Sequence, residues 1–181
     1  MNQTLKKLFT LIPVAISSSL LAGTYGILHD EITYVISWEY YTKFKFIQFG
    51  VKDFPVQNFF KVAVVGFLAT WWFGLFLGFF LGISGIYFKD WKTMYRNCIK
   101  FCFTAILITI CFEVIGFLYG YFVISNQPES ELSYLFIPEN IINFKRFISV
   151  GVMHTFGYFG ALVGLIYGMI INYRKSKLSL K

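Results

Sequence analysis

The sequence contains little charge. Only 14% of its 181 residues are Asp, Glu, Lys or Arg, against about 25% in an average soluble domain. Hydrophobic residues make up 57%, and phenylalanine alone occurs 23 times. A soluble domain of this size cannot bury so much apolar surface, because its surface is large relative to its volume. The composition therefore excludes an ordinary soluble globular protein and a disordered chain, and it indicates a multi-pass membrane protein.

Cysteine and the common catalytic motifs are also scarce or missing. The three cysteines, Cys98, Cys102 and Cys111, lie in or beside one apolar segment and are interpreted as small hydrophobic residues rather than a disulfide framework. The chain has no G-x-S-x-G elbow, no Walker loop and no H-E-x-x-H helix signature. It also has no basic soluble domain with which to bind nucleic acid. No enzyme class is indicated, so an enzymatic activity is not expected to be the main function.

Four long apolar segments are present. Each has at least the roughly 20 residues that a helix needs to cross the hydrocarbon core, and their apolar residues run continuously rather than alternating as in a barrel strand. We therefore predict an all-α integral membrane protein in which residues 1–181 form a single four-helix bundle. Lys6 and Lys7 before the first segment also fit a signal peptide, but we expect this segment to remain as an uncleaved helix. The four spans are residues 8–28, 62–87, 99–124 and 147–172.

Lysine and arginine are distributed unevenly over the two sides of this bundle. With the N-terminus inside, ten of them fall on the cytoplasmic side and six on the outer side. Cytoplasmic segments usually carry the excess, so we expect both termini and the connection 88–98 to be cytoplasmic. The inner set is Lys6, Lys7, Lys89, Lys92, Arg96, Lys100, Arg174, Lys175, Lys177 and Lys181, and the outer set is Lys43, Lys45, Lys52, Lys61, Lys145 and Arg146.

Two outer loops, residues 29–61 and 125–146, remain between the spans. The first is long enough to have structure or function of its own. Its stretch EITYVISWEYYTKFKFIQF is rich in β-branched and aromatic residues, alternates at Lys43–Phe46 and stops at Gly50. This pattern favours short strands, so we predict a partly β-structured cap over the bundle. An interfacial segment on the bilayer surface is the alternative.

The same loop carries a resemblance. The pattern HDEIT, then ISWEYYTKFKFIQFG, then the pair Trp71 and Trp72, resembles an uncharacterised bacterial family of small four-span membrane proteins with an EYFT-F-F-QF-type first outer loop. The fourth span, with His154 in GVMHTFGY, is less similar, and Trp38 and Tyr41 depart from the family pattern. The resemblance implies a bacterial inner (plasma) membrane protein and no known activity.

Small residues mark the expected helix contacts. Helices in lipid associate by close packing, which glycine permits. The second and fourth spans both carry glycines at i+4 spacing, and we expect these two spans to contact each other in the bundle, with a homodimer face as the alternative. The stripes are Gly66, Thr70, Gly74, Gly78 and Gly82 in the second span, and Gly160, Gly164 and Gly168 in the fourth.

Two ionisable residues fall inside the spans, and such residues are functional candidates because their burial in lipid is costly. Glu113 and His154 both lie in the outer half, counted at about 1.5 Å per residue. With Tyr25, Trp71 and Trp72 they define a predicted outward-facing polar pocket. His29, Asp30, Glu31 and Glu39 form a second candidate site in the outer loop.

Three functions remain open for these residues. The leading hypothesis is a non-enzymatic membrane protein that binds a partner or small ligand through the outer loop and the pocket, with Glu113 in a structural hydrogen bond. The second is a small transporter or channel component that uses Glu113 as its titrating group. The third is a metal-dependent membrane enzyme with zinc or iron at His29, Glu113 and His154, although no motif predicts a cofactor. Expected partners are the lipid bilayer and a further copy or another membrane protein.

Overall fold

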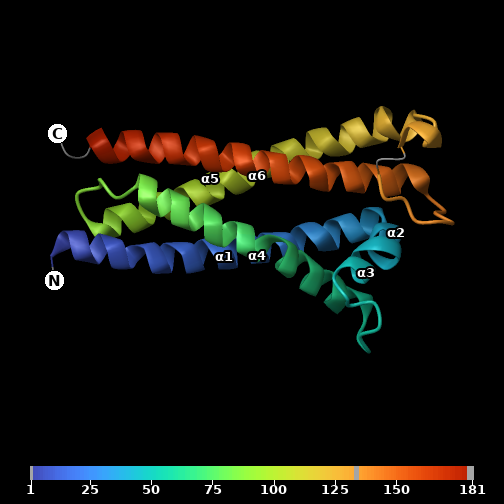
Figure 1. The fold of residues 1–181 in the computed structure, drawn as a ribbon, viewed down its shortest axis with the longest axis horizontal. Coiled ribbons are helices and arrows are strands. Elements are labelled where there is room, and N and C mark those ends of the chain that lie inside the picture. Colours follow the sequence, from blue (N-terminus) through green and yellow to red (C-terminus); the bar gives the residue numbers. More distant parts are fainter. Residues whose placement is uncertain (1, 133–134, 179–181) are drawn as a thin grey trace.

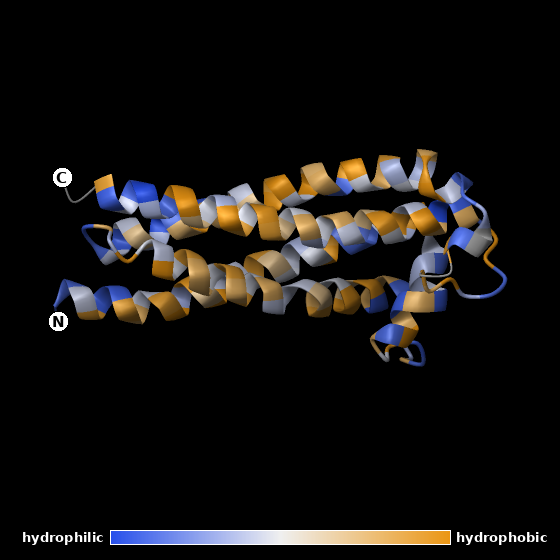
Figure 2. Ribbon diagram, turned by 45° about the horizontal axis from the view of Figure 1, so that its top comes forward, coloured by the Kyte–Doolittle hydropathy of each residue, from blue (hydrophilic) through white to orange (hydrophobic). Residues whose placement is uncertain are grey.

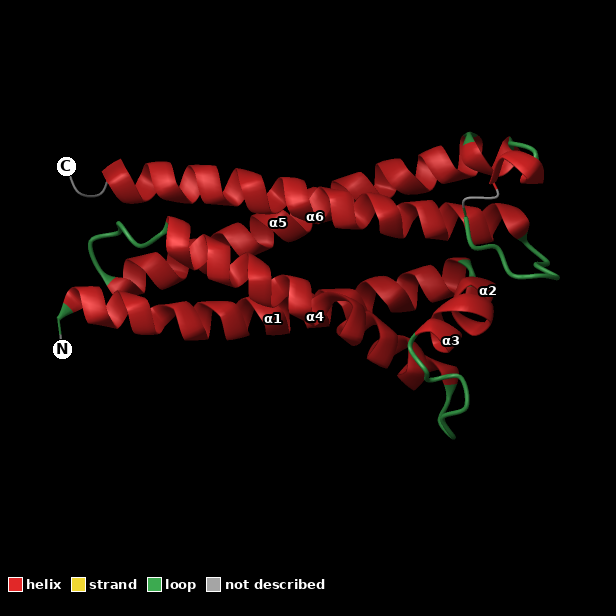
Figure 3. Cartoon of the chain, in the orientation of Figure 1, coloured by secondary structure: helices red, strands yellow, loops and turns green. Residues whose placement is uncertain are grey.

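The computed structural model describes residues 2–132 and 135–178, and within them every regular element is a helix (Figure 3). Four helices are long and apolar enough to span a membrane, which confirms the predicted number of such helices and fits a multi-pass membrane protein. Lys181, counted above, and residues 133–134 of the second outer loop lie outside the described residues. The four long helices are α1 (Gln3–Ile36), α4 (Asn58–Ser84), α5 (Trp91–Phe122) and α6 (Phe144–Leu178).

The four helices form two closely packed pairs, α1 with α4 and α5 with α6. Both termini lie at one end of the molecule, and the connections after α1 and α5 lie at the opposite end (Figure 1). We call this opposite end the loop end. Polar residues gather towards the two ends and hydrophobic residues cover the middle of the helices (Figure 2), as expected for segments that face hydrocarbon.

The glycine stripe of α4 packs against α1, not against the fourth span as expected from the sequence. A Cβ atom on Gly66 would lie 2.3 Å from the carbonyl oxygen of Gly26, and one on Gly74 would lie 2.5 Å from that of Ser18. Gly160 and Gly164 of the fourth span instead face α5, where Gly164 lies against Ala105, and only Gly168 lies nearest to a residue of α4, Leu81. The spacing of glycines identifies the helix faces that can approach another helix closely. Because any face of small residues can pack against any other, the spacing does not identify the partner helix.

The first outer loop is helical, so the prediction of a partly β-structured cap is wrong. Helix α1 continues to Ile36, and a chain of short helical turns follows it: α2 (Trp38–Tyr40), the π-helical turn η1 (Tyr41–Lys45) and α3 (Phe46–Gln48). The alternation of Lys and Phe indicated a strand, but it is only four residues long and is therefore a weak signal. Tyr40, Tyr41 and Phe46 are buried together from successive turns of a helix, and short aromatic runs do not distinguish the two periods.

Two apolar clusters fill the interior. One lies at the loop end, where aromatic side chains of the η1 segment pack against Phe147 and Val65. The other lies towards the termini around Leu81 and Cys102. The polar residues described next lie between them, on α1, α5 and α6.

Candidate functional site

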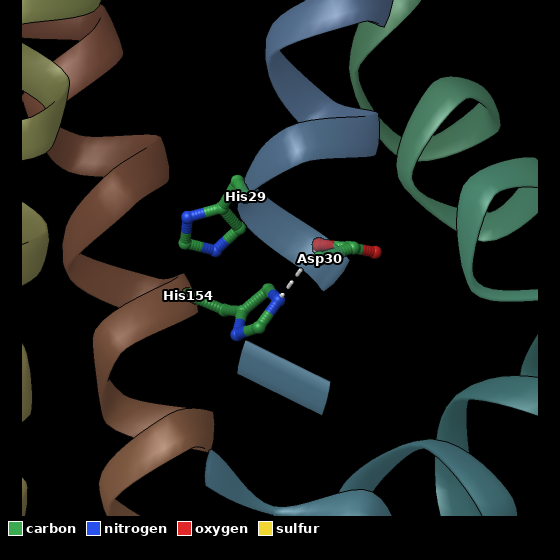
Figure 4. A group of neighbouring side chains, drawn as sticks. All are labelled: His29, Asp30 and His154. Atoms are coloured by element: carbon green, nitrogen blue, oxygen red, sulfur yellow. Dashed lines mark hydrogen bonds and ion pairs between the residues drawn. The ribbon is translucent and has the colours of Figure 1, made fainter. Parts of the chain in front are cut away.

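Two helices contribute the centre of the site. His29 and Asp30 are consecutive residues of α1, and His154 faces them from α6 (Figure 4). The Nε2 atom of His154 lies 3.4 Å from Oδ1 of Asp30, and the centroids of the two imidazole rings are 4.9 Å apart. One ligand atom from each residue falls within 4.8 Å of the others. Asp30 is only 3% exposed and His29 only 9%, so the cluster is inside the protein.

Each imidazole is held through its Nδ1 atom. His29 Nδ1 lies 3.3 Å from Oε2 of Glu113, and the Tyr25 hydroxyl donates to the same oxygen. His154 Nδ1 lies 2.8 Å from the carbonyl oxygen of Val150. A backbone carbonyl only accepts, so Nδ1 of His154 carries the proton and donates it. A carboxylate acceptor favours the same assignment for His29.

This tautomer leaves both Nε2 atoms as lone-pair acceptors in the cluster with Asp30. His29 Nε2 is buried and has no hydrogen-bond partner among the described residues. His154 Nε2 faces an Asp30 oxygen, which is itself an acceptor when ionised. Acceptors that face one another in a buried site require a cation or an extra proton between them. The geometry therefore has a place for a positive charge.

Local sequence explains how the outer residues reach this centre. Tyr25 and His29 are four residues apart on α1 and lie on one face of the helix, so both contact Glu113 of α5. Gly157 of α6 makes room for that carboxylate, because a Cβ atom there would lie 2.7 Å from Oε1 of Glu113. Glu113 thus links the α1–α4 pair to the α5–α6 pair.

A cavity of about 80 Å³ extends from the cluster into the space between the two helix pairs. Residues of all four long helices line it. Its polar end is formed by Tyr25, His29, Asp30, Glu113 and His154, and the remainder of its wall is mainly apolar. The site is therefore a small polar end on an otherwise apolar interior cavity.

The residues proposed from the sequence divide into two groups. Tyr25, Glu113 and His154 line this cavity, and His29 and Asp30, which we assigned to an outer loop, join them because α1 continues past residue 28. Trp71 and Trp72 do not line it. They are 38% and 44% exposed on the outside of α4, as expected for aromatic residues that face lipid. Glu113 contacts His29 rather than His154.

Glu31 and Glu39 are not members of the three-residue cluster. Glu39 is buried at the loop end, where its carboxylate accepts from the backbone N–H groups of Ile142 and Asn143 and from the Lys43 ammonium. Burial opposes its ionisation, but these three donors outweigh burial and hold the pKa of Glu39 below its usual range. Glu39 therefore connects α2 to the two residues that precede α6.

Sequence reasoning did not foresee that Asp30 faces His154. The available signal was the His-Asp pair directly after an apolar run, which we interpreted as the end of a helix. The chain matches no protein-family model, no curated protein and no solved structure. The chemistry of the site is therefore inferred from its own geometry.

Proposed function

We propose that this multi-pass membrane protein binds a divalent transition-metal ion through His29, Asp30 and His154. The observation that carries the proposal is the arrangement of the two Nε2 atoms and the Asp30 carboxylate, which present three acceptors to one point inside the protein. A metal ion supplies the positive charge that this arrangement requires. Two imidazoles and one carboxylate suit zinc or ferrous iron, and three protein ligands leave coordination positions open for water or another molecule.

The residues around the three ligands support the same proposal. Metal-bound histidines commonly donate their second ring N–H to a carboxylate or a backbone carbonyl, which orients the ring. Glu113 and the carbonyl of Val150 are placed for these two roles. Tyr25 in turn donates to Glu113. This support distinguishes the cluster from a chance meeting of three polar side chains.

The first test is metal content. Purified wild-type protein is expected to hold about one equivalent of metal, and His154→Ala and Asp30→Asn are expected to hold none, by elemental analysis. Reconstitution with Co²⁺ should give visible ligand-field absorption in wild type only. Glu113→Gln should weaken binding about 10- to 100-fold without abolishing it, because Glu113 orients a ligand but is not one.

A matched control is Asp53→Asn, which makes the same change as Asp30→Asn at an exposed position of the first outer loop. It should keep the full metal content. Equal metal in wild type and in both ligand variants would refute the proposal. Absence of metal from wild type, with no thermal stabilisation by added Zn²⁺, Fe²⁺ or Co²⁺, would instead assign the cluster a structural role between α1 and α6.

We further propose that both termini face the cytoplasm. Among the described residues, nine Lys and Arg lie on the segments at the end that holds the termini, against six on those at the loop end, and the cytoplasmic side usually has the excess. Fusion of a reporter that is active only inside the cell should give signal at either terminus and none after Gly50. The reverse pattern would place the metal site near the cytoplasmic surface.

A further inference from the structure

A second pocket lies at the loop end beside the metal-binding cluster. It has a volume of about 250 Å³ and lies between the η1 segment, residues 135–137 and the first turns of α6. His154 and Tyr158 line both this pocket and the interior cavity. The second pocket therefore adjoins the proposed metal site across the ring of His154.

Lys45 provides the charge in this pocket. Its side chain lines the pocket, although the residue is only 6% exposed. The ammonium donates to Oε1 of Gln48 at 3.0 Å, the one hydrogen bond it makes with the described residues, and no described carboxylate lies within ion-pair distance. An ammonium has three donors, so this buried cation has unused hydrogen-bonding capacity and no carboxylate in contact with it. Burial accordingly lowers the pKa of Lys45.

The rest of the pocket is apolar and aromatic. The Lys45 ammonium lies 5.2 Å from the ring centroid of Phe44, and Phe147 and Val152 line the wall on the α6 side. Phe136 and Tyr158 combine a place in the pocket wall with large exposure, so they form its rim. Tyr158 is exposed on the outside of α6. A molecule dissolved in the membrane can therefore reach this part of the rim.

We propose that this pocket binds a small amphipathic carboxylate, with its carboxylate on Lys45 and its apolar body against Phe44, Phe147 and Val152. The charge of Lys45 favours a ligand with a carboxylate, because an anion stabilises a buried ammonium that has no carboxylate in contact with it. The apolar wall and its exposed rim select a molecule that partitions into membranes. The carboxylate site needs no metal, but its position beside a bound metal rests on the function proposed above.

The test uses 4-phenylbutyrate as the probe and 4-phenylbutanol as its uncharged counterpart. Binding is measured by saturation-transfer NMR to chelator-treated protein in nanodiscs of zwitterionic lipid. Wild type should bind 4-phenylbutyrate at least about tenfold more tightly than 4-phenylbutanol. Lys45→Met should remove this preference. Lys45→Arg keeps the positive charge and should retain the preference. This second variant tests the proposal even if Lys45→Met folds less stably than wild type.

The matched control is Lys52→Met, which makes the same change at an exposed position of the same outer segment. It should bind like wild type. Equal affinity for the acid and the alcohol, or equal loss in Lys45→Met and Lys52→Met, would overturn the proposal. So would displacement of the probe by phosphatidylglycerol nanodiscs, which would assign the pocket to a phospholipid headgroup. Metal binding is measured on the same protein preparations. This measurement distinguishes failure of the carboxylate site from failure of the metal site.

Discussion

Gly26→Ala is expected to lower the free energy of unfolding by about 3 kcal/mol, the upper part of the range for overpacking in a well-packed interior. A Cβ atom at this position would lie 2.2 Å from the carbonyl oxygen of Gly66 and 2.3 Å from the Thr70 hydroxyl. Backbone cannot move aside as the tip of a flexible side chain does, so α1 and α4 have to separate. SDS titration of the purified protein, followed by circular dichroism, measures the loss.

The matched control is Gly151→Ala on α6. The same methyl group would there meet a ring carbon of Tyr40 at 3.4 Å, an ordinary contact, and alanine favours the helix over glycine. This variant should be as stable as wild type or slightly more stable. Equal loss in both variants would show that α1 and α4 do not pack through Gly26 and Gly66.

Glu39→Gln is expected to loosen the loop end and to cost about 3 kcal/mol, since hydrogen bonds to a buried charged group are among the stronger ones. Glutamine retains one acceptor oxygen and turns an amide N–H₂ towards groups that are themselves donors. At least one of Ile142 N–H, Asn143 N–H and the Lys43 ammonium then loses its acceptor. Faster proteolysis between α5 and α6 and a lower unfolding temperature are the expected observations.

The same carboxylate gives a pH dependence whose sign is fixed. Its pKa in the folded protein lies below the unfolded value, which is about 4.3. Glu39 therefore contributes its full stabilisation above the unfolded pKa and loses it as the pH falls through the folded pKa. Wild type should lose stability below about pH 4, and the difference between wild type and Glu39→Gln should shrink in that range.

Glu139→Gln is the control for both measurements, because Glu139 is exposed and lies in the loop that contains Ile142 and Asn143, the backbone partners of Glu39. It should leave proteolysis and the unfolding temperature unchanged. A Glu39→Gln protein with wild-type stability at pH 7 would show that the connection between α2 and the residues before α6 does not contribute to the stability of the fold.

The outer residues show where local patterns mislead. His29, Asp30 and Glu31 follow an apolar run, so they resemble the polar end of a helix, yet α1 continues to Ile36. His29 and Asp30 are tolerated within this helix because they contact Glu113 and His154 in the interior. The aromatic stretch after Ser37 has high strand propensity, but packing against Val65 and Phe147 keeps it helical. In both places tertiary contacts override the local preference.

The sequence by itself determined the four helices that are long and apolar enough to span a membrane, because length and apolarity are local properties. It also identified Tyr25, Glu113 and His154 as polar residues of interest, since buried ionisable groups are rare in lipid. Only the tertiary structure decided that α1 pairs with α4, and that Asp30 faces His154 from 124 residues away. Those contacts depend on which helix faces fit together in space, and the spacing of residues along one helix does not contain that information.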